Sequence, residues 1–113
     1  MSVFAVASVF RVRIRLTEVQ WKHITERHPE MAGQAGAIAA TIASPDVVFE
    51  VPDRMNYHYY RRYDTSPVTH DKFLCAVVRH RNGEGFVITA YFTSSINPKG
   101  KAKTYAKKVP HQL

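Results

Sequence analysis

The chain has 113 residues, of which 45% are hydrophobic, and its net charge is +7 with histidine counted as neutral. This length and composition suit one folded domain spanning residues 1–113 and exclude a compositionally disordered chain. The excess of Lys and Arg indicates a polyanionic partner, either nucleic acid or an anionic membrane, unless it only keeps the surface well solvated.

The first ten residues are apolar, but they are too few to span a bilayer and lack the basic start of a secretory signal. We therefore expect a strand or an ordered arm there and no membrane association. One cysteine allows no internal disulfide, which fits a cytoplasmic protein; delivery as part of a larger protein is the alternative. The single cysteine, Cys75, lies in an apolar run, which favours a small buried side chain over a nucleophile.

Residues 10–16 alternate strictly between apolar and basic side chains, which predicts a half-buried strand. Its outer face would carry three arginines. These charges either protect an edge strand from aggregation or bind phosphates. The candidates for RNA binding on this strand are Arg11, Arg13 and Arg15.

Two helices are predicted next. Thr17 and Gln20 form a capping-box pattern, so the first helix should run from Glu18 to about residue 28 and stop before Pro29. The second should cover residues 34–43, with Ile38 and Ile42 marking its buried stripe.

The remainder predicts four strands, at residues 47–51, 57–63, 73–80 and 85–93, and Asn82-Gly83 is typical of a tight hairpin between the last two. This order predicts an α+β fold, in which the N-terminal strand and the two helices pack on a four-stranded antiparallel sheet. The residues from about 97 to 113 form a basic tail that includes Lys99 and Lys101. It is either an arm that orders on nucleic acid or a frayed terminus.

The first helix carries the residues best suited to chemistry. His23 and Arg27 lie one turn apart, which suits a general acid or base beside a phosphate-binding guanidinium. His28 should lie on a different face, with Trp21 and Ile24, and is either a core or capping residue or a catalytic residue exposed at the helix end. His23 has its own alternative, that of a solvated surface histidine.

Two strands add aromatic and hydroxyl groups. On residues 57–63, Tyr60 and Arg62 share a face that could stack a base and bind phosphate, although tyrosine is also a common strand residue. On residues 85–93, alternation predicts one polar face and one apolar face. The polar face would hold Val87, Thr89, Tyr91 and Thr93, and the apolar face Phe86, Ile88, Ala90 and Phe92.

These residue types suffice for RNA cleavage without a metal or cofactor, since a base, a cation and an acid are all that attack by the ribose 2′-OH requires. The spacing of His23 and His28 is poor for a zinc site, so we expect no metal. Two alternatives remain open: a non-catalytic nucleic-acid-binding module, and a phage-derived protein-interaction domain.

The segment Trp21-x-His23-Ile24-x-x-Arg27-His28-Pro29-Glu30 resembles the helix motif of phage-associated nucleases in the barnase–EndoU–colicin–RelE superfamily. Further matches are the break at residues 44–46 and the strand at residues 87–91. The resemblance covers about residues 10–105. It implies helices on a four-stranded antiparallel sheet and metal-independent cleavage of RNA, often tRNA, by toxins that sometimes have an immunity or antitoxin partner.

The resemblance also implies where the site lies. It points to His23, Arg27 or His28 on the helix and to Tyr91 or Thr93 on the strand. Related toxins often pair a small hydroxyl residue with an aromatic one two positions away, and both Thr89-x-Tyr91 and Tyr91-x-Thr93 fit that pattern.

Overall fold

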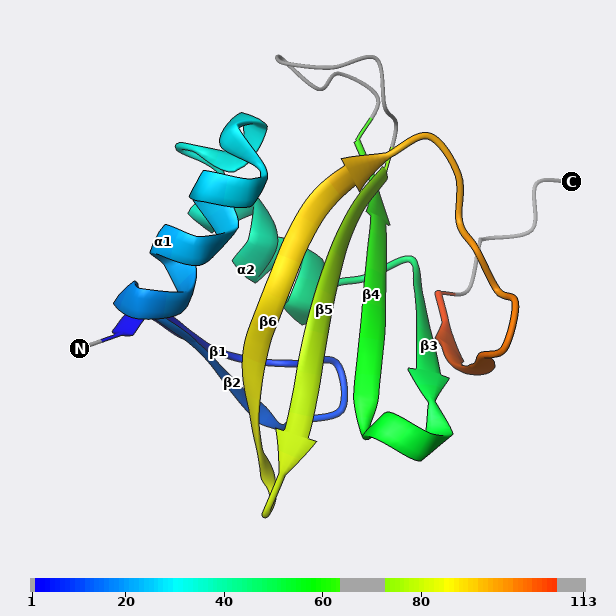
Figure 1. The fold of residues 1–113 in the computed structure, drawn as a ribbon. Coiled ribbons are helices and arrows are strands. Elements are labelled where there is room, and N and C mark those ends of the chain that lie inside the picture. The colour runs from blue at the N-terminus through cyan, green and yellow to red at the C-terminus, as the bar shows by residue number, and fades with distance from the viewer. Residues whose placement is uncertain (1, 64–72, 108–113) are drawn as a thin grey trace, which may run out of the picture.

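The computed structural model describes residues 2–63 and 73–107, which form two α-helices, two 3-10 turns and a seven-stranded sheet (Figure 1). In chain order the elements are β1 (Ser2–Ala7), β2 (Arg13–Thr17), α1 (Glu18–Arg27), η1 (Pro29–Met31), α2 (Ala35–Ala43), β3 (Val47–Val51), η2 (Pro52–Arg54), β4 (Asn56–Arg62), β5 (Phe73–Arg81), β6 (Glu84–Thr93) and β7 (Ala102–Ala106).

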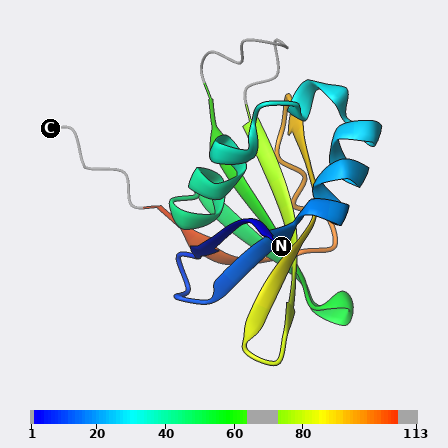
Figure 2. The same cartoon turned by 90° about the vertical axis from the view of Figure 1, so that its left-hand side faces the viewer.

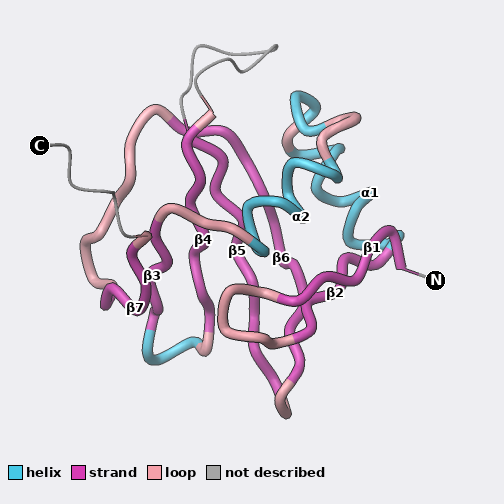
Figure 3. Tube along the Cα trace, turned by 180° about the vertical axis from the view of Figure 1, so that it is seen from behind, coloured by secondary structure: helices cyan, strands magenta, loops and turns pink. Residues whose placement is uncertain are grey.

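The strands lie in the order β1-β2-β6-β5-β4-β3-β7. Neighbouring strands are antiparallel, with the exception of β2 and β6, which run parallel. Helix α2 packs against β1, β4 and β5 on one face of the sheet (Figure 3), and α1 packs against β6 and β2. The opposite face, which includes Cys75, Val77 and Tyr91 and is turned toward the viewer in Figure 1, is called the open face below.

The predicted α+β class and the main elements agree with the structure. Thr17 caps α1 by accepting a hydrogen bond from the Gln20 backbone N–H at 3.2 Å, and the helix ends before Pro29. Glu18 in the first turn and Arg27 in the last match the helix dipole. Asn82 and Gly83 form the expected hairpin turn, both with positive φ.

The prediction of a four-stranded sheet was wrong, because the described residues form seven strands. One added strand, β7, comes from the basic tail and pairs with β3, so residues 102–106 are neither an arm nor a frayed end. The tail residues 108–113 lie outside the described residues. The other two strands added to the sheet, β1 and β2, form a hairpin at the edge opposite β7.

The strand predicted at residues 10–16 begins at Arg13 in the structure, three residues later than expected. Ser8 organises a turn before it, since its Oγ accepts from the backbone N–H groups of Phe10 and Val12. Arg11 takes a positive φ of 62° in this turn and therefore leaves the arginine row of the strand. Phe10 still packs in the core, in edge or tilted contact with Tyr57 and Tyr59.

The parallel pairing of β2 with β6 places α1, because β2 leads directly into that helix (Figure 2). Ile14 lies opposite Gly85 in this pairing, and both are buried. A Cβ added at Gly85 would overlap Ile14 Cδ1 and press on Val78 Cγ1 at 3.2 Å. Glycine at this position therefore leaves room for the Ile14 and Val78 side chains between β2, β6 and β5.

We expect Gly85→Ala to lower the free energy of unfolding by about 1–3 kcal/mol, the usual cost of overpacking a core. Urea unfolding measures the change. Gly36→Ala is the matched control, because a Cβ there meets nothing within 4 Å and alanine favours the helix. Equal stability of Gly85→Ala and wild type would contradict the tight contact between β2 and β6.

Candidate functional site

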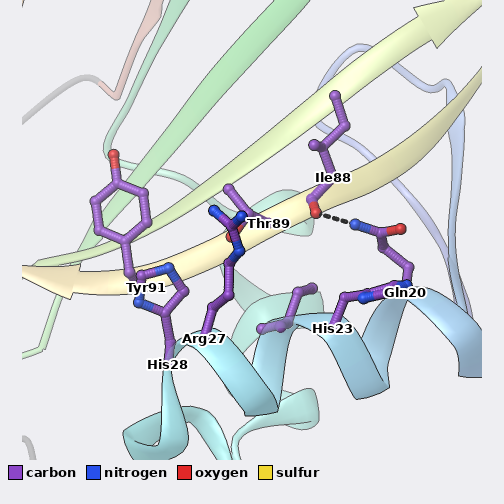
Figure 4. Close-up of a pocket in the computed structure, with 8 residues that line it drawn as sticks. Gln20, His23, Arg27, His28, Ile88, Thr89 and Tyr91 are labelled. Carbon is purple, nitrogen blue, oxygen red and sulfur yellow. Dashed lines mark hydrogen bonds between the residues drawn. The ribbon is translucent and has the colours of Figure 1, made fainter.

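Helix α1 lies beside the edge of β6 beyond the point where β2 leaves it. The strands β2 and β6 pair over residues 84–86, and farther along β6 the helix takes the place of a neighbouring strand. The Gln20 side chain donates a hydrogen bond from Nε2 to the Ile88 carbonyl oxygen (Figure 4). This bond satisfies a backbone acceptor that a sheet edge would leave without a strand partner.

The capping box is therefore only half formed. Thr17 caps the helix as predicted, but the Gln20 side chain binds β6 in place of the Thr17 backbone N–H. A local sequence pattern could not reveal this use of Gln20, because its acceptor is 68 residues away.

A bulge in β6 shapes the strand side of the site. Val77 pairs with Thr89 and Val78 with Val87, so Ile88 is the extra residue between them. The predicted faces of β6 were consequently wrong around this point. Val87 joins the helix-side core, while Ile88 packs on the open face with Tyr91. Bulges commonly re-aim side chains beside active sites.

Between α1 and this part of β6 lies an open cavity of about 530 Å³. It brings together four of the five predicted catalytic residues: His23, Arg27, His28 and Tyr91. Gln20, Ile24, Ile88 and Thr89 complete the lining. The fifth residue, Thr93, does not line it, and its hydroxyl instead bonds to the Ser95 carbonyl at 3.1 Å. Of the two hydroxyl–aromatic pairs considered, the cavity contains Thr89-x-Tyr91.

The two histidines share this cavity, contrary to the prediction that they lie on separate faces. At 100° per residue, the cavity-lining side chains of α1 spread over about 140° of the helix, with His23 and His28 at the two ends of that arc. A helix beside a strand edge presents such a wide arc, whereas the prediction assumed a narrow stripe packed flat on a sheet.

His28 is held in place from three sides. Its backbone N–H donates to the Ile24 carbonyl at 2.7 Å and closes the helix. Its Nδ1 lies 3.5 Å from Glu30 Oε1, and its ring lies 5.6 Å from the Tyr91 ring, centroid to centroid. An imidazole oriented at Nδ1 by a carboxylate offers Nε2 for proton transfer. The prediction gave Glu30 no role, although the residue follows the His-Pro step directly.

Tyr91 presents its ring to His28 and its hydroxyl away from α1 (Figure 4). The hydroxyl interacts with the thiol of Cys75, and Tyr60 lies nearby. Burial, followed by the neighbouring Cys75, raises the pKa of Tyr91 above its ordinary value. The phenol therefore stays neutral near pH 7, so its ring, rather than an ionised hydroxyl, contributes to the cavity.

His23 and Arg27 are exposed at the rim of the cavity. Figure 4 shows the Arg27 side chain extending from α1 toward Thr89 on β6. The permanent charge of this guanidinium makes the rim basic. An anion that enters the cavity would meet the Arg27 guanidinium and both imidazoles, which can bind phosphate and move protons.

The residues predicted to bind RNA do not form one surface. Arg13 and Arg15 lie on the open face beside β6, whereas Arg11 lies in the turn before β2. Tyr60 is 2% exposed and cannot stack a base in this structure. Arg62 and Lys99 are exposed. The Lys101 ammonium donates to the Asn97 carbonyl at 2.7 Å. Burial lowers the pKa of His58, and the positive charge of Lys101 lowers it further.

Within residues 2–63 and 73–107, no three His, Cys, Asp or Glu side chains gather in an arrangement that could hold a metal ion. No helix in the same ranges is both long and apolar enough to cross a membrane. Comparisons of the chain with protein-family models, with curated proteins and with solved structures found no match. The resemblance to the barnase–EndoU–colicin–RelE superfamily thus stays a prediction.

Gln20→Ala should lower the free energy of unfolding by about 1 kcal/mol, because it removes the side chain that satisfies the Ile88 carbonyl. Thermal or urea unfolding measures this. Gln34→Ala is the control, since Gln34 precedes α2 without a side-chain capping bond. If both variants are destabilised equally, the bond between α1 and β6 contributes nothing.

Cys75 generates a prediction for alkaline pH. Burial raises the pKa of its thiol from 9.0 to about 11, so the unfolded chain releases this proton at a lower pH than the folded protein. Stability should fall as the pH rises from 9 toward 11, by at most about 1.4 kcal/mol per pH unit from this group. Urea unfolding at each pH measures the free energy of unfolding, which should depend less on pH between 9 and 10 in Cys75→Ala than in the wild type. Parallel profiles for the two proteins would contradict the raised thiol pKa.

Proposed function

We propose that the protein is a metal-independent endoribonuclease and that the cavity between α1 and β6 is its active site. One observation carries the proposal: two histidines and an arginine line the same open cavity, and one of those histidines is oriented by a carboxylate. Glu30 at Nδ1 and the Tyr91 ring beside the imidazole both limit the orientations of the His28 side chain.

In the proposed reaction, His28 Nε2 takes the proton from a ribose 2′-OH, and the 2′ oxygen attacks the adjacent phosphorus. The bond from phosphorus to the 5′ oxygen breaks, and His23 donates a proton to that oxygen. The products are a 2′,3′-cyclic phosphate and a free 5′-OH. DNA lacks the attacking hydroxyl, so the chemistry selects RNA.

Three other residues assist in this scheme. Arg27 binds the non-bridging phosphate oxygens and stabilises the charge that grows on them during attack. Thr89 can donate its hydroxyl to the same phosphate from the bulged strand. Tyr91 acts as a positioning residue, because its ring packs beside the His28 ring while its hydroxyl stays with Cys75.

The resemblance to the barnase–EndoU–colicin–RelE superfamily supports the same chemistry and extends the proposal. On that basis the substrate is tRNA, the protein acts as a toxin in the cytoplasm, and an antitoxin or immunity protein restrains it. These three statements rest on the helix motif around His23 and His28, whereas the cleavage reaction rests on the cavity as well.

A second candidate is a nucleic-acid-binding module without catalysis. The observation that favours it is the row of arginines on the open face, which binds phosphates whether or not a cleaving group is nearby. Salt-sensitive RNA binding without any cleavage product would select this alternative.

The purified protein should cleave tRNA in the presence of EDTA and leave 2′,3′-cyclic phosphate ends. His28→Ala should lower the cleavage rate roughly 10²–10⁴-fold, the usual contribution of a general base. Lys22→Ala is the control, because Lys22 points about 170° away from the centre of the cavity-lining arc. Gel electrophoresis and mass spectrometry of the products measure both results.

Two outcomes would contradict this function. One is a wild-type protein that cleaves no RNA with or without EDTA. The other is equal cleavage of a substrate whose single 2′-OH at the cut site is replaced by hydrogen, because the attack requires that oxygen.

A further inference from the structure

We infer that a second, basic subsite on the open face continues the cavity along β6 and binds single-stranded RNA that extends beyond the cleaved bond. We call it the arginine subsite; it consists of Arg13, Arg15, Arg79, Arg81 and Phe86. The inference deepens the proposed function and rests on it for the identity of the ligand.

Strand register brings the arginines together. Ile14 on β2 and Val78 on β5 belong to the helix-side core, so the residues on either side of each point to the open face. Arg79 lies opposite Phe86, and Arg15 lies beside Phe86 on the other flank of β6. Basic residues on the two strands that flank β6 thus lie beside the position of Phe86, and the Arg15 side chain contacts its ring.

A second cavity, of about 330 Å³, adjoins Phe86, and Arg13 and Arg15 lie outside its lining. Arg79, Arg81 and Phe86 line it, together with Gln20 and Ile88, which also line the first cavity. The hydrogen bond between Gln20 and Ile88 therefore forms a shared wall, and the two cavities follow one another along β6. A single chain laid along the strand would meet both.

The charge and the ring suit a nucleic acid strand. The Arg15 guanidinium lies 5.4 Å from the Phe86 ring centroid, an arrangement in which guanidinium and ring together offer flat surfaces to a base. Glu84 lies 3.7 Å from Arg15 and lowers the local charge, but the four arginines outnumber it. Arg79 and Arg81 are exposed, and the Nε of Arg79 donates to Asn56 Oδ1 at 3.3 Å.

The distance between the first cavity and the arginine subsite sets the length of RNA that can occupy both. Phe86 and Tyr91 are five residues apart, which is roughly 16 Å along a strand. A dinucleotide in the cavity would not reach the arginine subsite, whereas an unpaired strand of several nucleotides would. Flat stacking surfaces also require bases that are not paired within a duplex.

The test is binding, measured by fluorescence anisotropy, of a labelled eight-nucleotide RNA in which every 2′-OH is methylated to prevent cleavage. The Arg79→Gln/Arg81→Gln double variant should bind at least about tenfold more weakly at low salt. The slope of log affinity against log salt should fall by roughly 0.7 for each phosphate that the variant no longer binds. Arg11→Gln/Lys22→Gln removes the same charge elsewhere and should change affinity much less.

Two further measurements separate weaker RNA binding at the subsite from a damaged fold. Glu84→Gln removes the acid among these arginines and should strengthen binding several-fold, which a destabilised protein would not do. A dinucleotide of the same chemistry should bind the wild type and the double arginine variant equally, because it does not span the two cavities.

A fall in affinity equal to that of the control double variant would overturn the inference, as would unchanged affinity and salt slope. Stronger binding of an RNA duplex than of the single strand would replace the proposed ligand class. These results are independent of catalysis, because the probe cannot be cleaved. A protein that binds it as expected but cleaves no RNA would refute the ribonuclease proposal and leave the arginine subsite standing.

Discussion

The geometry of the site depends on one exchange of partners along β6. Its first residues pair with β2, and its next ones face α1, which begins where β2 ends. At this exchange, Gly85 leaves room for the Ile14 side chain of β2, and the Gln20 side chain gives the Ile88 carbonyl a donor. A helix placed beside a strand edge, rather than flat on a sheet, leaves a cavity between them. The candidate active site is that cavity.

The bulge at Ile88 gives the cavity its second wall. Without an extra residue, strict alternation would turn Val87 toward the open face and bury Ile88 with the helices. With it, Ile88 joins Thr89 and Tyr91 in the cavity lining and also contributes to the second cavity along the strand. The same irregularity therefore joins the site of the proposed chemistry to the arginine subsite.

Sequence patterns predicted what depends on local order and missed what depends on distant partners. The cap at Thr17, the stop at Pro29 and the Asn82-Gly83 turn follow from a few neighbouring residues, and all three agree with the structure. The strand β7, the bulge in β6 and the bond from Gln20 to Ile88 each require a partner many residues away. The helical wheel gave correct angles, but the assumed packing wrongly separated His23 from His28. The sequence left Thr89-x-Tyr91 and Tyr91-x-Thr93 open, and it gave no sign that Glu30 contacts His28.

His28 is the residue at which structural and catalytic explanations differ most clearly. A helix-terminating histidine needs only its backbone N–H, and that group already bonds to Ile24. Its side chain could have pointed to solvent at little cost, but it lies between Glu30 and Tyr91 at the cavity wall. Ordering a side chain costs conformational entropy, which the weak, partly exposed contact with Glu30 offsets only in small part. In the proposed reaction, the contacts with Glu30 and Tyr91 set the orientation of the ring whose Nε2 takes the proton.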